Sequence, residues 1–329
     1  MKRKKITLHL FGAGNLLAEA VKIGIKKNVS VVVRTSPRLY KKNNSWVQNV
    51  YNANVPIYIG NSLLELSKKG PKIMKGDIGF SFGAPWIFKK EWIRQWGGNL
   101  FNCHNRPLPR HRGAGGATWL ILMAEKMCAS TIHRIDTGVD TGPITFQKTY
   151  KFPKDIVTPR GIDIFCENQG KKFLRKSLPK IFRGYRPFLK QNNETATYWP
   201  RLSTSAQGWI NWNWPALDIK SFCNAFGEPY EGAKSFFGKT LIYVHKLEIV
   251  KEEGQLFHPF QIGLIFRKGK NESLYVAHPD GIIHVKRWST KKDMKTPKIG
   301  DRLFTPNKYL EKSLSCKVQY LPNGKIVTS

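Results

Sequence analysis

The sequence predicts an α/β fold in which an open, mostly parallel sheet is followed by a smaller C-terminal β-barrel. Short apolar runs alternate with amphipathic segments over about the first 145 residues, which is typical of a parallel sheet with helical connections. After about residue 205, short β-rich segments are separated by Gly, Pro, Asn and Lys, as in a small antiparallel barrel or sandwich. A chain of 329 residues is also long for one core, so we expect two domains.

The elements of the first part follow in order from local patterns. β-Branched and apolar runs predict strands, and apolar residues at helical spacing predict helices. A long helix with a break at Pro179 is expected near the end of this part. The expected strands are 6–11, 29–35, 55–60, 77–86, 99–105 and 129–135, and the expected helices are 16–28, 44–54, 61–70, 89–98, 116–126 and 158–185.

The two parts are expected to differ in architecture. The first resembles a Rossmann-like sheet and is expected to form one domain over residues 1–195, with a linker at 196–204. The second, residues 205–329, is expected to form an OB-like barrel. Its predicted strands are 239–250, 260–268, 272–278 and 281–288.

The charge balance is strongly basic. Lys and Arg number 55 against 22 Asp and Glu, a net charge of +33, which indicates an anionic partner such as nucleic acid, a membrane surface or a phosphorylated substrate. Residues 171–190 alone hold eight Lys or Arg and no acid. A Lys-rich composition with no binding role stays open as the alternative.

The five cysteines do not indicate a disulfide framework or a metal site. The count is odd and no C-x-x-C occurs, so we expect reduced thiols, no bound metal and a cytoplasmic protein. The basic first residues resemble the start of a signal peptide, but the apolar run is short and ends at Gly12. No apolar run of about 18 residues predicts a membrane span.

The glycines after the first strand raise the alternative of a dinucleotide site. G-x-G-x-x-G would need a third glycine at the position of Leu17, and no acidic residue ends the second strand. We therefore interpret Gly12 and Gly14 as residues of a tight turn between strand and helix.

Two polar residues at the end of a predicted strand indicate a reactive site. Asn102 and His104 lie two residues apart, so their side chains share a face of the strand. We expect strand 129–135 to lie beside them and the turn that follows, with Asp136 and Asp140, to end next to His104. An amide donor, an imidazole and a carboxylate without a nucleophile suit acyl transfer to an amine.

At this point a family resemblance appears. N-x-H with x-L-P-x-x-R-G over Leu108 to Gly113, followed by D-x-G-x-D-T-G from Asp136, resembles the folate-dependent formyltransferases. These include methionyl-tRNA formyltransferase and the N-formyltransferases of nucleotide-linked amino sugars. Segments such as YWPRL and GWINWNWPALDI resemble the start of the family's C-terminal barrel.

The resemblance implies the donor and the roles of the site residues. The donor would be 10-formyltetrahydrofolate, with Asn102, His104 and Asp140 as catalytic residues. The other implied positions fall into two sets. The folate would lie against Trp86, Ile87, Phe88, Asp136, Thr137, Gly138 and Val139, with the pterin against the ring of Trp86. The basic loop would bind the acceptor through Arg110, Arg112 and Gly113, with Arg201 from the linker.

Local departures guide the choice of acceptor. After R-G the chain has AGGATW where the initiator-tRNA enzymes have A-A-P-I, and the first turn is GAGN, not G-T-P. The resemblance therefore favours a nucleotide-linked amino sugar of surface glycans as the acceptor. A tRNA acceptor stays open, as does a homodimer. A basic nucleic-acid-binding protein with an inactive site is the alternative from another class.

Overall fold

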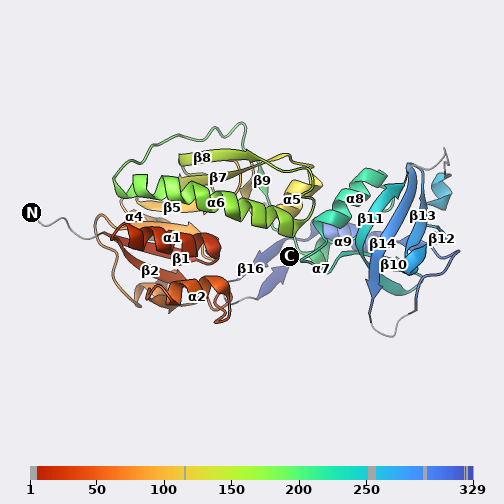
Figure 1. The fold of residues 1–329 in the computed structure, drawn as a ribbon, viewed down its shortest axis with the longest axis horizontal. Coiled ribbons are helices and arrows are strands. Elements are labelled where there is room, and N and C mark those ends of the chain that lie inside the picture. Colours follow the sequence, from red (N-terminus) through yellow and green to blue (C-terminus); the bar gives the residue numbers. More distant parts are fainter. Residues whose placement is uncertain are drawn as a thin grey trace, which may run out of the picture.

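The computed structural model describes residues 6–114, 116–250, 257–291, 295–321, 323 and 325–328. Two sheets lie side by side along the long axis of the molecule, each with its own core (Figure 1). The sheet with the N-terminal strands carries the candidate site.

The first sheet has seven strands in the order β3-β2-β1-β4-β5-β7-β8. The first five run parallel, β7 is antiparallel to β5, and β8 is antiparallel to β7. This confirms the predicted open, mostly parallel sheet. The strands are β1 (Thr7–Gly12), β2 (Ser30–Thr35), β3 (Ile57–Ile59), β4 (Ile78–Phe82), β5 (Leu100–His104), β7 (Met127–Arg134) and β8 (Ile144–Lys151).

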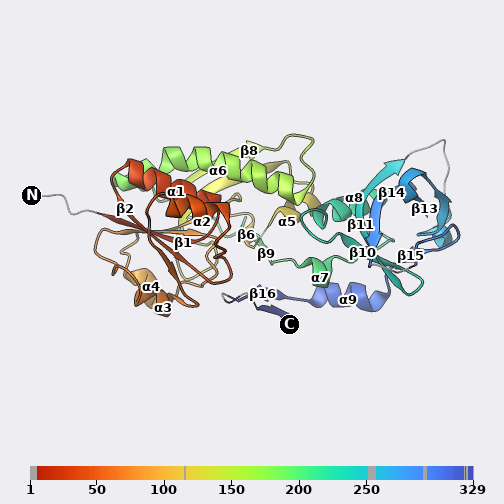
Figure 2. The ribbon, with the colours of Figure 1, turned by 60° about the horizontal axis from the view of Figure 1, so that its bottom comes forward.

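Helices cover both faces of this sheet, which gives three layers (Figure 2). One face packs against the amphipathic helix α1 and against α2 and α6, and the other lies on the side of α3 and α4. Apolar residues at helical spacing produce the buried face of α1. The bounds are α1 (Asn15–Lys26), α2 (Ser45–Tyr51), α3 (Leu63–Ser67), α4 (Lys90–Arg94) and α6 (Pro159–Phe182).

Three details of this part differ from the sequence-based expectation. The helix predicted to break at Pro179 continues through it, because only one further turn remains before the helix ends at Phe182. Strand β8 was not predicted. The antiparallel direction of β7 was not predicted either, because hydrophobic patterning does not report strand direction.

The turn after β1 uses glycine for close backbone approach. A Cβ on Gly12 would lie 2.2 Å from the carbonyl oxygen of Phe82, and both Gly12 and Gly14 have positive φ, of 110° and 98°. This agrees with the interpretation of the GAG segment as a tight turn.

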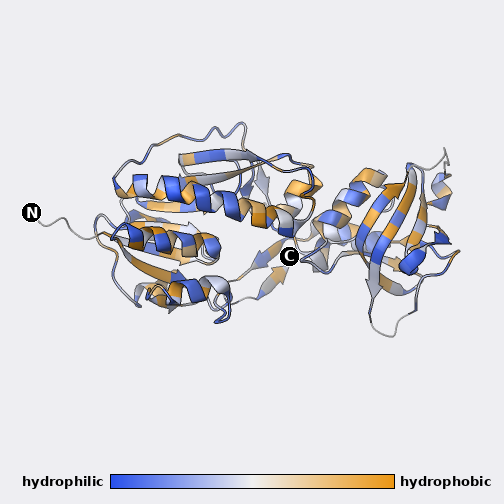
Figure 3. Ribbon diagram, viewed as in Figure 1, coloured by the Kyte–Doolittle hydropathy of each residue, from blue (hydrophilic) through white to orange (hydrophobic). Residues whose placement is uncertain are grey.

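The second sheet is antiparallel and curled, with six strands in the order β12-β13-β14-β11-β10-β15. Its strands alternate hydrophobic and hydrophilic residues, with the inward side chains forming a separate core beside α8 (Figure 3). Each predicted strand of the C-terminal part has a counterpart, but the strand expected at 260–268 begins only at Ile265, because a 3₁₀ helix and a turn precede it. The elements are α8 (Ala216–Ala225), β10 (Ala233–Phe237), β11 (Thr240–Val250), η1 (Pro259–Gln261), β12 (Ile265–Lys268), η2 (Lys270–Glu272), β13 (Leu274–His278), β14 (Gly281–Thr290) and β15 (Leu303–Phe304).

Short elements connect the two sheets. Helix α5 packs against α8, and Ile121 and Leu122 of α5 contact the core of the second sheet. After β15 the chain returns through α9 and β16 along the underside of the molecule toward the first sheet (Figure 2). These elements are β6 (Arg112–Gly113), α5 (Ala117–Leu122), β9 (Tyr198–Trp199), α7 (Thr204–Gln207), α9 (Asn307–Ser315), β16 (Val318–Tyr320) and β17 (Ile326–Thr328).

None of the helices in the described part of the chain combines the length and apolar character needed to cross a membrane.

Candidate active site

The site is built around the carboxylate of Asp140, which gathers polar groups from three segments. Its Oδ1 accepts a hydrogen bond from Asn102 Nδ2 at 3.1 Å and lies 3.2 Å from His133 Nε2. Its Oδ2 accepts from the backbone N–H of Gly113 at 2.9 Å and lies 3.7 Å from His104 Nδ1. Asn102, His104 and Asp140, predicted from separate motifs, therefore lie together.

Burial and partners act in opposite directions on Asp140. Burial alone would raise the pKa of its carboxyl group, but the contact with His133, the neighbouring His104 and the Gly113 N–H together hold that pKa well below its ordinary value. Asp140 is therefore ionised at neutral pH. The site keeps a fixed negative charge behind His104.

His104 lies between two hydrogen-bond acceptors. Its Nε2 donates to the backbone carbonyl oxygen of His111 at 2.8 Å, and its Nδ1 faces Asp140. Burial lowers the pKa of His104 below its ordinary value, although Asp140 and the His111 carbonyl act in the opposite direction. The ring is thus neutral at neutral pH, and a proton arriving at Nδ1 would meet a carboxylate.

His133 is a member of the cluster that sequence analysis did not assign to the site. Its Nδ1 donates to the carbonyl oxygen of Arg134 at 2.8 Å, and its Nε2 lies 3.2 Å from Asn102 Nδ2. The residue pairs with Asn102 across β5 and β7. The sequence shows His133 as a histidine inside an apolar strand. Its place in the site depends on the register in which β7 pairs with β5, so the sequence alone did not indicate it.

Gln191, which was also not predicted as a site residue from the sequence, connects the turn that carries Asp140 to the basic loop. Gln191 Nε2 donates to the carbonyl oxygens of Asp140 and Gly142 at 2.9 and 2.6 Å. Its Oε1 accepts from Arg112 Nε at 3.0 Å. Gln191 thereby connects the segment after α6 to both halves of the site.

The structure corrects the expected role of Arg112. Its side chain is buried, with hydrogen bonds to Gln191 and Asn193, so it positions the loop and does not face an anionic acceptor. Gly113 serves Asp140 through its N–H, and a Cβ there would lie 2.5 Å from the ring of Tyr198. Arg110 and Arg201 are exposed, as an acceptor contact requires.

The turn from Asp136 to Asp140 is a preformed rim. Asp136 Oδ1 accepts from the Gly138 N–H at 3.1 Å and from Thr141 Oγ1 at 2.6 Å, which closes the turn. Gly142 is required because a Cβ there would lie 1.9 Å from the Arg134 carbonyl oxygen. Thr137, Gly138 and Val139 are exposed on this rim.

The loop after β4 differs from the expectation of an open aromatic surface. The Trp86 side chain is buried at 7% exposure, and its Nε1 donates to the Asn61 carbonyl oxygen at 3.0 Å. Phe88 is also buried, with its ring against Phe11. Stacking of a flat ligand on the Trp86 indole is therefore wrong for this conformation. Ile87, at 74% exposure, is the side chain that the loop offers.

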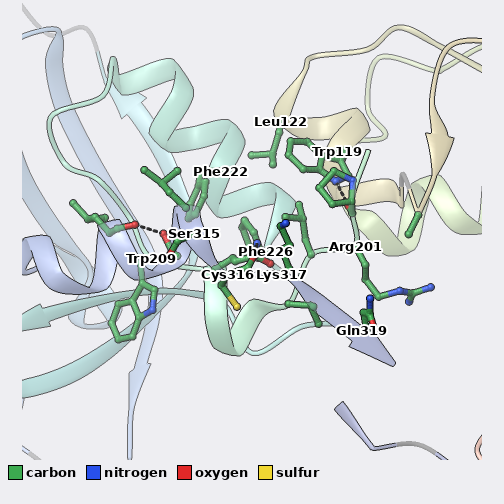
Figure 4. A pocket seen from close by; sticks show the side chains of 18 of the residues that line it. Trp119, Leu122, Arg201, Trp209, Phe222, Phe226, Ser315, Cys316, Lys317 and Gln319 are labelled. Carbon is green, nitrogen blue, oxygen red and sulfur yellow. Dashed lines mark hydrogen bonds between the residues drawn. The ribbon is translucent and has the colours of Figure 1, made fainter. Parts of the chain in front are cut away.

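A cleft of about 1190 Å³ adjoins the site. Pro85, Ile87 and Ala114 lie at its border with the site, and its walls continue through α5, α8 and the C-terminal segment (Figure 4). The cleft therefore begins next to Gly113, whose N–H bonds to Asp140, and extends between the two sheets.

Two family models match this chain. A model described as formyl transferase matches residues 85–156, and one described as formyl transferase, C-terminal domain, matches residues 203–301. The first match contains Asn102, His104 and Asp140.

Solved structures with similar folds include several formyltransferases. The sugar 3N-formyltransferase WlaRD, solved with dTDP and 5-N-formyl-THF, has a TM-score of 0.67 at 21% identity, covering 89% of this chain and all of its own. The N-formyltransferase from Helicobacter canadensis, in complex with folinic acid and dTDP-3-aminofucose, has a TM-score of 0.65 at 22% identity, covering 86% and 100%. A sugar N-formyltransferase from a Shewanella species has a TM-score of 0.58 at 15% identity, covering 75% and 99%.

Proposed function

This chain belongs to the formyl transferase family, and we propose that it moves a formyl group from 10-formyltetrahydrofolate to the amine of a nucleotide-linked amino sugar. The observation that carries the proposal is the cluster of Asn102, His104 and Asp140 on one rim of the sheet. An amide donor, a neutral imidazole and a fixed carboxylate are the groups that formyl transfer to an amine needs.

The residues present fit a folate donor, which would supply the activated formyl carbonyl. Exposed Ile87 and Val139 offer apolar contacts, and the exposed turn at 137–138 offers backbone groups. We propose that these two loops hold the pterin. Trp86 and Phe88 would support the loop from within, and Asp136 would keep the turn closed.

We propose the following roles for the cluster. Asp140 Oδ1 and His133 Nε2 lie only 3.2 Å apart on one side of Asn102 Nδ2, so they can share one N–H of the amide, and the other N–H can then stabilise the oxygen of the attacked formyl carbonyl. His104 would take up at Nδ1 the proton that the attacking amine releases and return it to the donor's nitrogen as the bond between that nitrogen and the formyl carbon breaks, so that the N-formyl sugar and tetrahydrofolate are the products. In its charged form both ring N–H groups have acceptors, the His111 carbonyl oxygen and Asp140 Oδ2. Asp140 stabilises that charge.

The amino-sugar acceptor is supported by the local sequence and by the extent of the fold match. AGGATW follows Arg112-Gly113, where the tRNA enzymes resembled in sequence have A-A-P-I. Both similar structures are covered over their full lengths: WlaRD is a sugar 3N-formyltransferase solved with dTDP, and the Helicobacter canadensis N-formyltransferase was solved with dTDP-3-aminofucose. We extend that acceptor class to this chain.

The proposal is tested by following a labelled formyl group. The protein is incubated with formyl-labelled 10-formyltetrahydrofolate and a panel of nucleotide-linked amino sugars, and mass spectrometry detects the N-formyl product. Asn102→Ala is expected to lose product formation, whereas Asn52→Ala, at an exposed site after α2, keeps it. Release of label as formate with no formylated sugar in any reaction would refute the proposal.

A further inference from the structure

The cleft beside the active site has apolar walls drawn from both halves of the molecule. Trp119 and Leu122 come from α5, Phe222 comes from α8, and Phe226 directly follows α8 (Figure 4). The Trp119 ring lies 5.0 Å from the ring of Trp199, and its Nε1 donates to the Pro200 carbonyl oxygen at 2.7 Å. This wall is therefore fixed in place and rich in flat rings.

Several large apolar side chains on the cleft are exposed to solvent. Ile87 is 74% exposed, Tyr198 60% and Leu314 84%. Exposed apolar residues scattered singly need no explanation, but a group of them around one concave surface indicates a binding site.

Cationic and amide groups lie on the same cleft. Arg201 and Lys317 line it together with Gln319, and all three belong to exposed positions (Figure 4). Flat rings beside cations are the chemistry that recognises an aromatic base carrying a phosphate chain. Ala114, which lines this cleft, directly follows Gly113, whose N–H bonds to Asp140, so one end of the cleft lies near the reactive cluster.

The third side of the cleft comes from the end of the chain. Leu310, Leu314 and Lys317 belong to the segment that runs from α9 into β16, and all of them line the cleft. The family model for the C-terminal part ends at residue 301, so this segment lies beyond it. Nothing in the family match assigns it a role.

We propose, on the basis of the function proposed above, that residues 307–321 are an acceptor-specificity segment that binds the nucleoside diphosphate part of the acceptor. The base lies against the aromatic wall of α5 and α8. Lys317 contacts the diphosphate from the opposite side. This arrangement leaves the amino sugar directed toward Asn102 and His104.

The direct test measures binding of dTDP and of UDP to the full chain by calorimetry. Lys317→Ala is expected to weaken the tighter of the two by about tenfold, as expected for the loss of one charge-assisted contact. Lys312→Ala is the matched control, since Lys312 lies in the same segment but does not line the cleft. Equal dissociation constants for the two variants, or no binding of either nucleotide to the unmodified protein, would overturn the inference.

Two substitutions of opposite charge at the same exposed position distinguish an electrostatic effect on acceptor binding from a loss of folding. Leu314 is 84% exposed, so both Leu314→Asp and Leu314→Lys are compatible with the fold. The Asp variant should raise the KM for the nucleotide-linked acceptor and the Lys variant should lower it, with the KM for the folate donor constant in both. Identical acceptor KM values would contradict the inference.

Failure of this inference is distinguishable from failure of the proposed function. If the unmodified protein formylates an amino sugar while Lys317→Ala binds nucleotides normally, the segment is not involved and the function stands. If no nucleotide-linked amino sugar is formylated although nucleotide binding depends on Lys317, the cleft assignment stands and the acceptor is wrong.

Discussion

Asp140 is the residue on which the geometry of the site depends. Its carboxylate bonds to the Asn102 amide and the Gly113 N–H, and it also faces the rings of His104 and His133. A buried carboxylate is costly unless such partners surround it, so its position is determined by the fold. Its presence makes a charged His104 more favourable than burial alone would allow.

At the residue scale, we predict that His104→Ala abolishes formyl transfer and leaves the fold intact. Loss of a general base costs roughly 100- to 10,000-fold in rate. Steady-state kcat and thermal unfolding check this, with His258→Ala, on an exposed turn of the second sheet, as the control. Turnover near the unmodified level in His104→Ala would remove that residue from the mechanism.

A second residue-scale prediction concerns pH. Burial lowers the pKa of His104 and Asp140 acts against that shift, so Asp140→Asn must lower the pKa further. If neutral His104 is the active form, the rate rises with pH through its lowered pKa and is flat above it. The acidic limb of the pH–rate profile should therefore move to lower pH in Asp140→Asn, while the maximum rate falls.

An NMR titration of the His104 ring measures the same shift independently of activity. An unchanged or raised pKa in Asp140→Asn would show that the carboxylate does not influence the ring.

At the element scale, the turn after β7 brings Asp140 to the site from a strand whose antiparallel direction was not predicted. Because β7 is antiparallel to β5, its last residues lie beside the first residues of β5, with Arg134 opposite Phe101. The turn then folds back toward His104, and Gln191 holds it there. The motifs predicted the contact between Asp140 and His104. They did not predict the antiparallel direction of β7 or the hydrogen bond from Gln191 that holds the turn.

We predict that Gly142→Ala disrupts this turn. The added Cβ would lie 1.9 Å from the Arg134 carbonyl oxygen, so the backbone must shift and displace Asp140. The free energy of unfolding should fall by about 1–3 kcal/mol, and kcat should fall with it. Gly116→Ala is the matched control, since its Cβ would meet only one atom, at 3.9 Å. Equal activity in both variants would contradict the role of the turn.

Sequence patterning predicted most elements because each depends on local periodicity. It predicted that Asn102 and His104 share a face because of their spacing along a strand, and that the turn with Asp140 ends beside them; the structure brings the three together, and their catalytic roles stay a proposal. It did not predict the roles of His133 and Gln191, which depend on pairing register and on a segment about 50 residues away. It also misjudged Trp86 and Arg112, because exposure depends on tertiary packing.

At the scale of the whole molecule, part of the basic charge on α6 is paired with acids. On α6, Lys171 pairs with Glu167 at 2.5 Å, and Arg175 pairs with Glu19 at 2.6 Å. Two of the eight cations in residues 171–190 are thus paired with acids. We keep as a proposal the division into a catalytic domain at 1–195, a linker at 196–204 and a barrel-like domain at 205–329.

We therefore predict a weak salt dependence of acceptor binding. The acceptor KM should change only a few-fold between about 50 and 200 mM salt, where a contact with many phosphates would cost on the order of a thousand-fold. Neutralising Lys171, Lys172, Arg175 and Lys176 together should leave turnover with the amino sugar largely intact. A steep salt slope would favour a nucleic-acid acceptor.

The proposal that the formyl acceptor is a nucleotide-linked amino sugar is tested most directly by comparing specificity constants for two classes of acceptor in one assay. Release of tetrahydrofolate from 10-formyltetrahydrofolate is followed with each nucleotide-linked amino sugar and with charged initiator tRNA, in parallel with His104→Ala. We predict a measurable kcat/KM for at least one amino sugar, far above that for tRNA. His104→Ala should lose this activity. Turnover with tRNA alone, or turnover that survives the loss of His104, would contradict the proposal.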